Sequence, residues 1–204
     1  MRFLSTLSLS LLVLIFASCQ PSPTKEGIFM ILPSPSSIEI SGISQLTATD
    51  IAVLVDQAKA DYISGKELHL VDYKSMAFKL DTNSDINAEG YTLDITKDHI
   101  DISASSKEGL WYGVITLGQL VQDGLDQEAA LPIISVRDEP ALSYRAVHLD
   151  VKHHLEKKDY YFELMDRLAD MKINGIILEI EDKLAFEKQP KVGSSDAWSI
   201  ADWK

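Results

Sequence analysis

Residues 143–182 of this chain read SYRAVHLDVKHHLEKKDYYFELMDRLADMKINGIILEIED. The β-branched and apolar residues of 144–151 predict a strand, and the apolar run 176–180 predicts a second one. Between them, apolar residues recur at helical spacing over 162–171, and Asn174-Gly175 is typical of the C-terminal end of a helix. A strand, a helix and a strand in about 40 residues form a βαβ unit, which implies a parallel sheet covered on both faces.

The residues before this unit predict a separate α+β domain, 27–140. Helices are expected over 51–63 and from Lys107 to about Val121, the second ended by Gly124. Alternating residues on both sides of the turn 96–98 predict a hairpin with one buried face, so the sheet should be mainly antiparallel. Short apolar or alternating runs predict strands at 27–35, 38–40, 68–71, 77–80, 90–95, 99–103 and 131–136.

Three glycines lie inside the second predicted helix. Gly109, Gly113 and Gly118 each cost up to ~1 kcal/mol against alanine in a helix interior. They indicate that this helix packs closely against the sheet or another backbone.

The residues after the βαβ unit have a loop-like composition, and 199–203 resemble the opening of another helix. A single βαβ unit leaves sheet edges and faces uncovered. We therefore expect 141–204 to be an incomplete second domain.

Composition and charge exclude some classes of protein for this chain. The 204 residues are 46% hydrophobic, enough for a core, and the net charge of −12 argues against a nucleic-acid partner, which needs a basic face. The only cysteine is Cys19, so an intrachain disulfide is not possible.

The N-terminus has the form of a signal peptide. A short positive start precedes the apolar run 3–17, and Phe16-Ala17-Ser18-Cys19 resembles a bacterial lipobox. We expect 1–19 to be a lipoprotein signal, Cys19 to carry the lipid, and the polar residues 20–26 to be a tether. By the same resemblance, Gln20 favours the outer membrane, on its periplasmic or surface side. The alternative is an ordinary cleaved secretory signal.

Three segments together resemble the bacterial glycoside hydrolases of family 20, the β-N-acetylhexosaminidases. They are EGYTLDI (89–95) with HIDI (99–102), SASSKEGLWYG with TLGQL (103–120), and ISVRDEP with YR and LD (134–150). The resemblance implies that 141–204 opens a (β/α)8 barrel, with the βαβ unit as its first strand, first helix and second strand. Ala146, His153-His154 and the changed pattern around Asp182 depart from the family. The combination of modules also resembles family 84, which acts on O-linked N-acetylglucosamine.

In family 20 an Asp-Glu pair at the end of the fourth barrel strand carries out substrate-assisted retention. By this resemblance the pair would lie beyond Lys204, so no catalytic residue is named and these 204 residues should be inactive alone. The acidic pairs Asp138-Glu139 and Glu181-Asp182 are interpreted as surface pairs, which are common in acidic chains.

The resemblance implies two substrate-binding residues, Arg145 and Asp182. The alternative for Arg145 is a structural role tying the linker to the barrel rim. His153-His154 is interpreted as a solvated loop, because adjacent residues rarely converge on one ion; no metal and no cofactor are expected. Trp111 and Tyr112 should pack at a domain interface, and Trp198 and Trp203 on the core face of a helix; the alternative for these aromatic residues is stacking on a sugar.

The sequence therefore predicts the N-terminal part of an exported β-N-acetylhexosaminidase that acts on N-acetylhexosamine-containing glycans. The alternative is a stand-alone, non-catalytic module for glycan binding or assembly.

Overall fold

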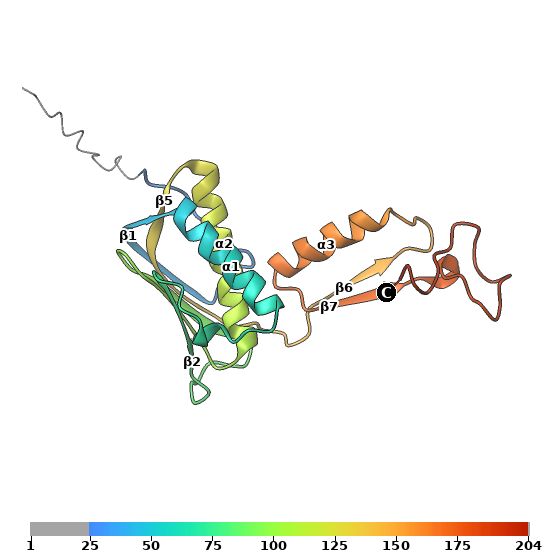
Figure 1. Cartoon of the computed structure of the whole chain (residues 1–204), viewed down its shortest axis with the longest axis horizontal. Coiled ribbons are helices and arrows are strands. Elements are labelled where there is room, and N and C mark those ends of the chain that lie inside the picture. The colour runs from blue at the N-terminus through green and yellow to red at the C-terminus, as the bar shows by residue number, and fades with distance from the viewer. Residues whose placement is uncertain (1–24, 204) are drawn as a thin grey trace, which may run out of the picture.

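The computed structural model describes residues 25–203 as two units joined by a short linker (Figure 1). The predicted signal peptide, the lipidation site Cys19 and most of the tether lie outside the described residues. Among the helices of residues 25–203, none is long and apolar enough to cross a membrane.

The first unit is a five-stranded sheet with two helices on one face (Figure 1). The helices are α1 (Ala48–Ile63) and α2 (Lys107–Gln127). The strand order is β1-β5-β3-β4-β2. The strands are β1 (Ser37–Thr47), β2 (Met76–Leu80), β3 (Tyr91–Ile95), β4 (Ile100–Ala104) and β5 (Ala130–Asp138). This confirms the predicted α+β domain.

The hairpin is confirmed: β3 and β4 pair antiparallel, with Leu93 opposite Ile102. Both side chains are fully buried under α2, because alternate residues of each strand face the helices. The sheet is mixed rather than wholly antiparallel, since β2 runs parallel to β4.

The second predicted helix is longer than expected. Its first turn is capped by Ser106, whose hydroxyl accepts hydrogen bonds from the backbone N–H groups of Glu108 and Gly109. Gly124 does not end it: α2 continues to Gln127 and stops at Glu128, which adopts a left-handed conformation (φ 51°).

The strand predicted at 27–35 was wrong. This segment forms no sheet pairing; side chains of α2 bind its backbone instead. The N–H groups of Ile28, Met30 and Leu32 donate to Gln127, Asp123 and Gln119 respectively, at 2.7–2.9 Å. Two residues of extended chain rise about 6.6 Å and four residues of helix about 6 Å, so the two spacings match. We call residues 28–36 the strap.

The strand predicted at 68–71 was also wrong. Leu68–Leu70 is one turn of 3₁₀ helix, and Leu68 is buried in the core as its anchor. An apolar run this short does not distinguish a strand from a buried turn.

The second unit is the βαβ arrangement that the sequence predicted. β6 (Ala146–Asp150) and β7 (Gly175–Glu179) pair in parallel, and α3 (Lys158–Asp170) connects them. Within residues 25–203, α3 lies over one face of this sheet and the other face is open (Figure 1). Ile177 of β7 is 49% exposed.

The C-terminal residues form turns rather than the opening of a helix. A short 3₁₀ helix, η2 (Glu181–Lys183), follows β7, and Ser199 closes a turn with Asp202. Trp198 and Trp203 pack around Tyr161 of α3 instead of lying on a helix face of their own.

Candidate functional site

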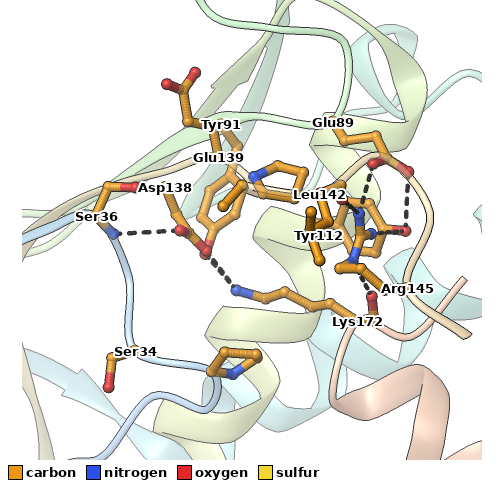
Figure 2. Close-up of a pocket in the computed structure, with 13 residues that line it drawn as sticks. Ser34, Ser36, Glu89, Tyr91, Tyr112, Asp138, Glu139, Leu142, Arg145 and Lys172 are labelled. Atoms are coloured by element: carbon orange, nitrogen blue, oxygen red, sulfur yellow. Dashed lines mark hydrogen bonds and ion pairs between the residues drawn. The ribbon is translucent and has the colours of Figure 1, made fainter. Parts of the chain in front are cut away.

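A cavity of about 350 Å³ lies where the two units meet (Figure 2). Its walls come from the end of the strap (33–36), the start of β3 with the preceding Glu89, Tyr112 of α2, the end of β5 with the linker after it (138–142), and the turn between α3 and β7. Two cations from the second unit, Arg145 and Lys172, point into it, and each meets a carboxylate of the first unit (Figure 2).

The guanidinium of Arg145 makes four hydrogen bonds, all to protein groups. Its Nη1 lies 2.8 Å from Glu89 Oε2 and 2.7 Å from the Leu142 carbonyl oxygen. Its Nη2 donates to the Tyr112 hydroxyl at 3.0 Å, and its Nε donates to the Lys172 carbonyl at 2.8 Å. The Arg145 side chain is only 15% exposed. The guanidinium therefore joins the linker, α2 and the α3–β7 turn.

Glu89 receives a second donor from the second unit, because the Asn174 amide lies 3.1 Å from its Oε1. The hydrogen bond from Arg145, assisted by those from Asn174 and Tyr112, lowers the pKa of Glu89 below its usual value and outweighs the opposing effect of burial. The carboxylate is thus held in its charged form.

Lys172 makes the second contact between the units. Its Nζ lies 2.8 Å from both Asp138 Oδ2 and the Tyr91 hydroxyl. Tyr91 in turn shares a hydrogen bond with Thr116 of α2. Burial lowers the pKa of Lys172, and hydrogen bonding to Asp138 opposes that shift. Burial also raises the pKa of Tyr91, so this hydroxyl stays protonated.

The opposite end of the parallel sheet carries a second charged cluster. Lys152 Nζ lies 2.9 Å from Glu179 Oε1 and 3.1 Å from Asp150 Oδ2, and His148 contacts the other oxygen of Glu179 at 2.9 Å. The hydrogen bond from Lys152 lowers the pKa of Glu179. In parallel α/β folds this carboxyl end of the strands is where sites form.

The two predicted substrate-binding residues lie at opposite ends of this sheet. Asp182 follows β7 in η2, at the carboxyl end, and its backbone carbonyl accepts hydrogen bonds from Ser194. Arg145 precedes β6, at the amino end, with its donors engaged by protein. Its position matches the structural alternative, while its role in binding a sugar stays a prediction.

The other candidate residues fall in different places. His154 pairs with Glu156 inside the loop after β6. Residues 25–203 contain no group of three side chains arranged to hold a metal ion. Trp111 stacks on Tyr62 within the first unit, at 4.6 Å between ring centroids, so only Tyr112 lies at the interface between units.

Sequence reasoning missed the roles of Glu89, Tyr91 and Lys172. The first two stand in the EGY motif, which marked the hairpin but gave no indication that its side chains reach another unit. Nothing in the sequence marked Lys172 as a buried contact between the units, because a lysine in a turn is ordinarily exposed to solvent.

Glu89→Gln should make stability less dependent on pH in the acid range. The pKa of Glu89 is lower in the folded protein than in the unfolded chain, so its stabilising effect is complete above about pH 4.5 and is lost as the pH falls through the folded value. Urea unfolding at pH 7 and pH 3 should show a wild-type advantage over Glu89→Gln that is larger at pH 7. Glu163→Gln, at an exposed position of α3, is the control. A difference that does not change with pH would contradict the assignment.

Comparisons with known proteins follow the same division into units. The model of glycosyl hydrolase family 20, domain 2, matches residues 30–139, more than half of the chain. This chain belongs to glycosyl hydrolase family 20. The match covers the first unit almost entirely and confirms the family that the three motifs indicated.

Curated relatives agree with this family. The chain is 28% identical over 162 residues to a beta-hexosaminidase of Vibrio vulnificus, covering 74% of this chain and 18% of that protein. It is 34% identical over 101 residues to a beta-hexosaminidase of Porphyromonas gingivalis, covering 47% of this chain and 13% of the relative. The chain thus spans less than a fifth of the length of either relative.

Solved structures share the fold at low identity. An N-acetyl-beta-hexosaminidase of Streptomyces plicatus matches 85% of this chain and 42% of its own, with a TM-score of 0.60 and 21% identity. A chitobiase of Flavobacterium johnsoniae matches 84% of this chain and 31% of its own, with a TM-score of 0.62 and 20% identity.

Proposed function

We propose that this chain is the N-terminal part of an exported β-N-acetylhexosaminidase that releases terminal N-acetylhexosamine from glycans. The observation that carries the proposal is the family 20 match over residues 30–139, followed directly by the parallel unit β6-α3-β7. A structure from Vibrio harveyi, a family 20 exo-beta-N-acetylglucosaminidase, holds N-acetylglucosamine, which supports the same class of substrate.

We further propose that residues 141–204 open a (β/α)8 barrel, after an N-terminal domain at 27–140. Structural matches that cover 85% of the chain must extend into residues 141–204, because residues 1–140 are only about two thirds of it. The open face of β6 and β7 supports the same assignment, since a parallel sheet is ordinarily covered on both faces. A stand-alone module, the first alternative, would not explain why one face of the parallel sheet is left open. The second alternative, a family 84 enzyme, is less well supported because the matching family model is that of family 20.

The division of labour in the proposed enzyme follows from these positions. The Asp-Glu pair that performs substrate-assisted retention in the family would come from sequence after Lys204. The described residues would contribute the carboxyl ends of the first two barrel strands, where Asp182 is the proposed sugar contact. We also propose that residues 1–19 are a lipoprotein signal and that the lipid on Cys19 holds the enzyme at the outer membrane.

The intact mass of the native protein tests these proposals. An antibody against residues 27–136 should isolate from its own cells a species several tens of kilodaltons heavier than the 22.7 kDa of this chain. That species should hydrolyse an aryl N-acetyl-β-glucosaminide. Its N-terminal peptide should begin at Cys19 and carry acyl chains. A native species near 22.7 kDa without hydrolase activity would contradict the enzyme proposal. An N-terminus without lipid would contradict only the proposed lipid anchor on Cys19.

A further inference from the structure

Lys172 takes part in the junction between the two units through its side-chain ammonium and through its backbone carbonyl oxygen. We propose that Lys172 is a positioning residue that locks the parallel unit β6-α3-β7 onto the α+β domain, so that the α+β domain orients the first strands of the parallel sheet. The lock consists of Lys172, Arg145 and Asn174 from the second unit and Glu89, Tyr91 and Asp138 from the first. The proposal does not depend on the proposed enzymatic activity.

The contacts of Lys172 are more buried than those of the other ions at the junction. Its side chain is 8% exposed and that of Asp138 is 14% exposed. The ammonium also lies 5.0 Å from the centre of the Tyr91 ring, a cation–π distance. A lysine buried to this degree is stabilised only by such partners, and here all of them belong to the other unit.

The backbone of Lys172 joins the same lock. Its carbonyl oxygen accepts the Arg145 Nε hydrogen bond, so the two cations are coupled through one residue. Lys172 also adopts a left-handed conformation (φ 60°), which disfavours a residue with a side chain. The left-handed backbone at Lys172 costs free energy, but it places the residue where its side chain can reach Asp138.

The lock holds both strands where they begin. Arg145 immediately precedes β6 and Asn174 immediately precedes β7. The Arg145 N–H donates to the Asn174 side chain at 2.8 Å, and the Asn174 N–H donates to the Arg145 carbonyl at 3.0 Å. Both residues also bind Glu89 of the first unit. Glu89 therefore holds the start of the β6–β7 pairing, where Ala146 lies opposite Gly175, in a fixed position relative to the first unit. A two-stranded sheet is marginal by itself, so this attachment should control its order.

The strap ends at the same place. The Ser36 N–H donates to the second oxygen of Asp138 at 3.3 Å. Gln119 of α2 binds Leu32 of the strap and donates to the Asp170 carbonyl at the end of α3, at 2.7 Å. The strap, α2 and the parallel unit thus meet around Asp138 and Lys172.

The polar groups that line the cavity are mostly satisfied by one another. Arg145 pairs with Glu89, and Lys172 pairs with Asp138, so the two cation–carboxylate pairs are neutral as a set (Figure 2). This arrangement suits attachment between units better than capture of a charged ligand, which would have to break these pairs first.

Hydrogen exchange on the whole chain, read by mass spectrometry, tests the lock. Lys172→Met should raise the exchange rates of the amides of β6 and β7 on the order of 100-fold, because the unpaired Asp138 loses its buried partner. The amides of β3 and α2 should change by less than about tenfold, since the first unit keeps its own core. Adding Asp138→Leu to Lys172→Met should restore at least part of the protection, as no charge is then left unpaired.

Lys183→Met is the matched control. Lys183 is also a buried lysine of the second unit, with a side chain that is 11% exposed, but its partner Asp196 belongs to the same unit. This variant should affect residues 183–203 and leave β6 and β7 close to wild type. Three results would each overturn the proposal: unchanged exchange in Lys172→Met, an equal loss at β6 and β7 in Lys183→Met, or an equal loss in β3 and α2.

Discussion

Replacing Arg145 with methionine is expected to lower the free energy of unfolding by about 2–4 kcal/mol. Methionine keeps much of the side-chain volume but removes four hydrogen bonds, to Glu89, Leu142, Tyr112 and Lys172. Glu89, which is 23% exposed, then keeps a negative charge without the cation that compensates it. Loss of the charge partner, rather than loss of packing, should dominate the effect.

Chemical unfolding without any sugar present measures this effect, and Arg137→Met is its control. Arg137 also pairs with a carboxylate, but that partner, Asp85, is 88% exposed, and exposed pairs contribute about 0–1 kcal/mol. The two variants delete the same cation in different surroundings. If Arg145→Met unfolds like the wild type, its guanidinium does not join the units, and the sugar-binding role predicted from the family resemblance becomes the better explanation.

Gly109→Ala is expected to lower the free energy of unfolding by about 1–3 kcal/mol. The usual effect in a helix has the opposite sign, since alanine is favoured over glycine by up to ~1 kcal/mol. Here a Cβ at residue 109 would collide with the backbone carbonyl oxygen of Gly90 and lie 2.8 Å from the Ala104 side chain. A backbone atom cannot rotate away, so α2 would have to move from the hairpin.

Gly118→Ala is the matched control in the same helix. Its Cβ would lie 3.6 Å from the nearest atom, in Val55 of α1, which is ordinary contact. This variant should gain about 0.5–1 kcal/mol from helix propensity alone. Thermal or urea unfolding should therefore give opposite signs for the two variants. A gain in both would show that α2 does not approach the hairpin as closely as the structure has it.

The glycines of α2 show how far sequence reasoning reached. Their unusual number predicted close packing, and Gly109 confirms it against the backbone of Gly90. The same reasoning could not separate Gly109 from Gly118, because both occupy helical positions in one apolar sequence. The difference depends on which neighbour each glycine faces in the folded chain.

The strap is the clearest failure among the predicted elements. Residues 27–35 carry the composition of a strand, but their backbone N–H groups bind the side chains of Gln119, Asp123 and Gln127 instead of a neighbouring strand. The local sequence indicates that a segment favours a strand-like conformation. It does not indicate which part of the protein the segment will bind. Here the partner is about 90 residues away in the chain, and the fold alone brings the two together.

Alternation, helical spacing and three ordered motifs are local patterns, and they were sufficient to predict the α+β domain, its hairpin, the βαβ unit and the family. How the two units are joined depends on contacts that form only in the folded chain. Arg145 and Lys172 act there through Glu89 and Asp138, which lie 56 and 34 residues away. The energy of a buried ion pair depends on burial and on sub-ångström distances that no spacing in the sequence records.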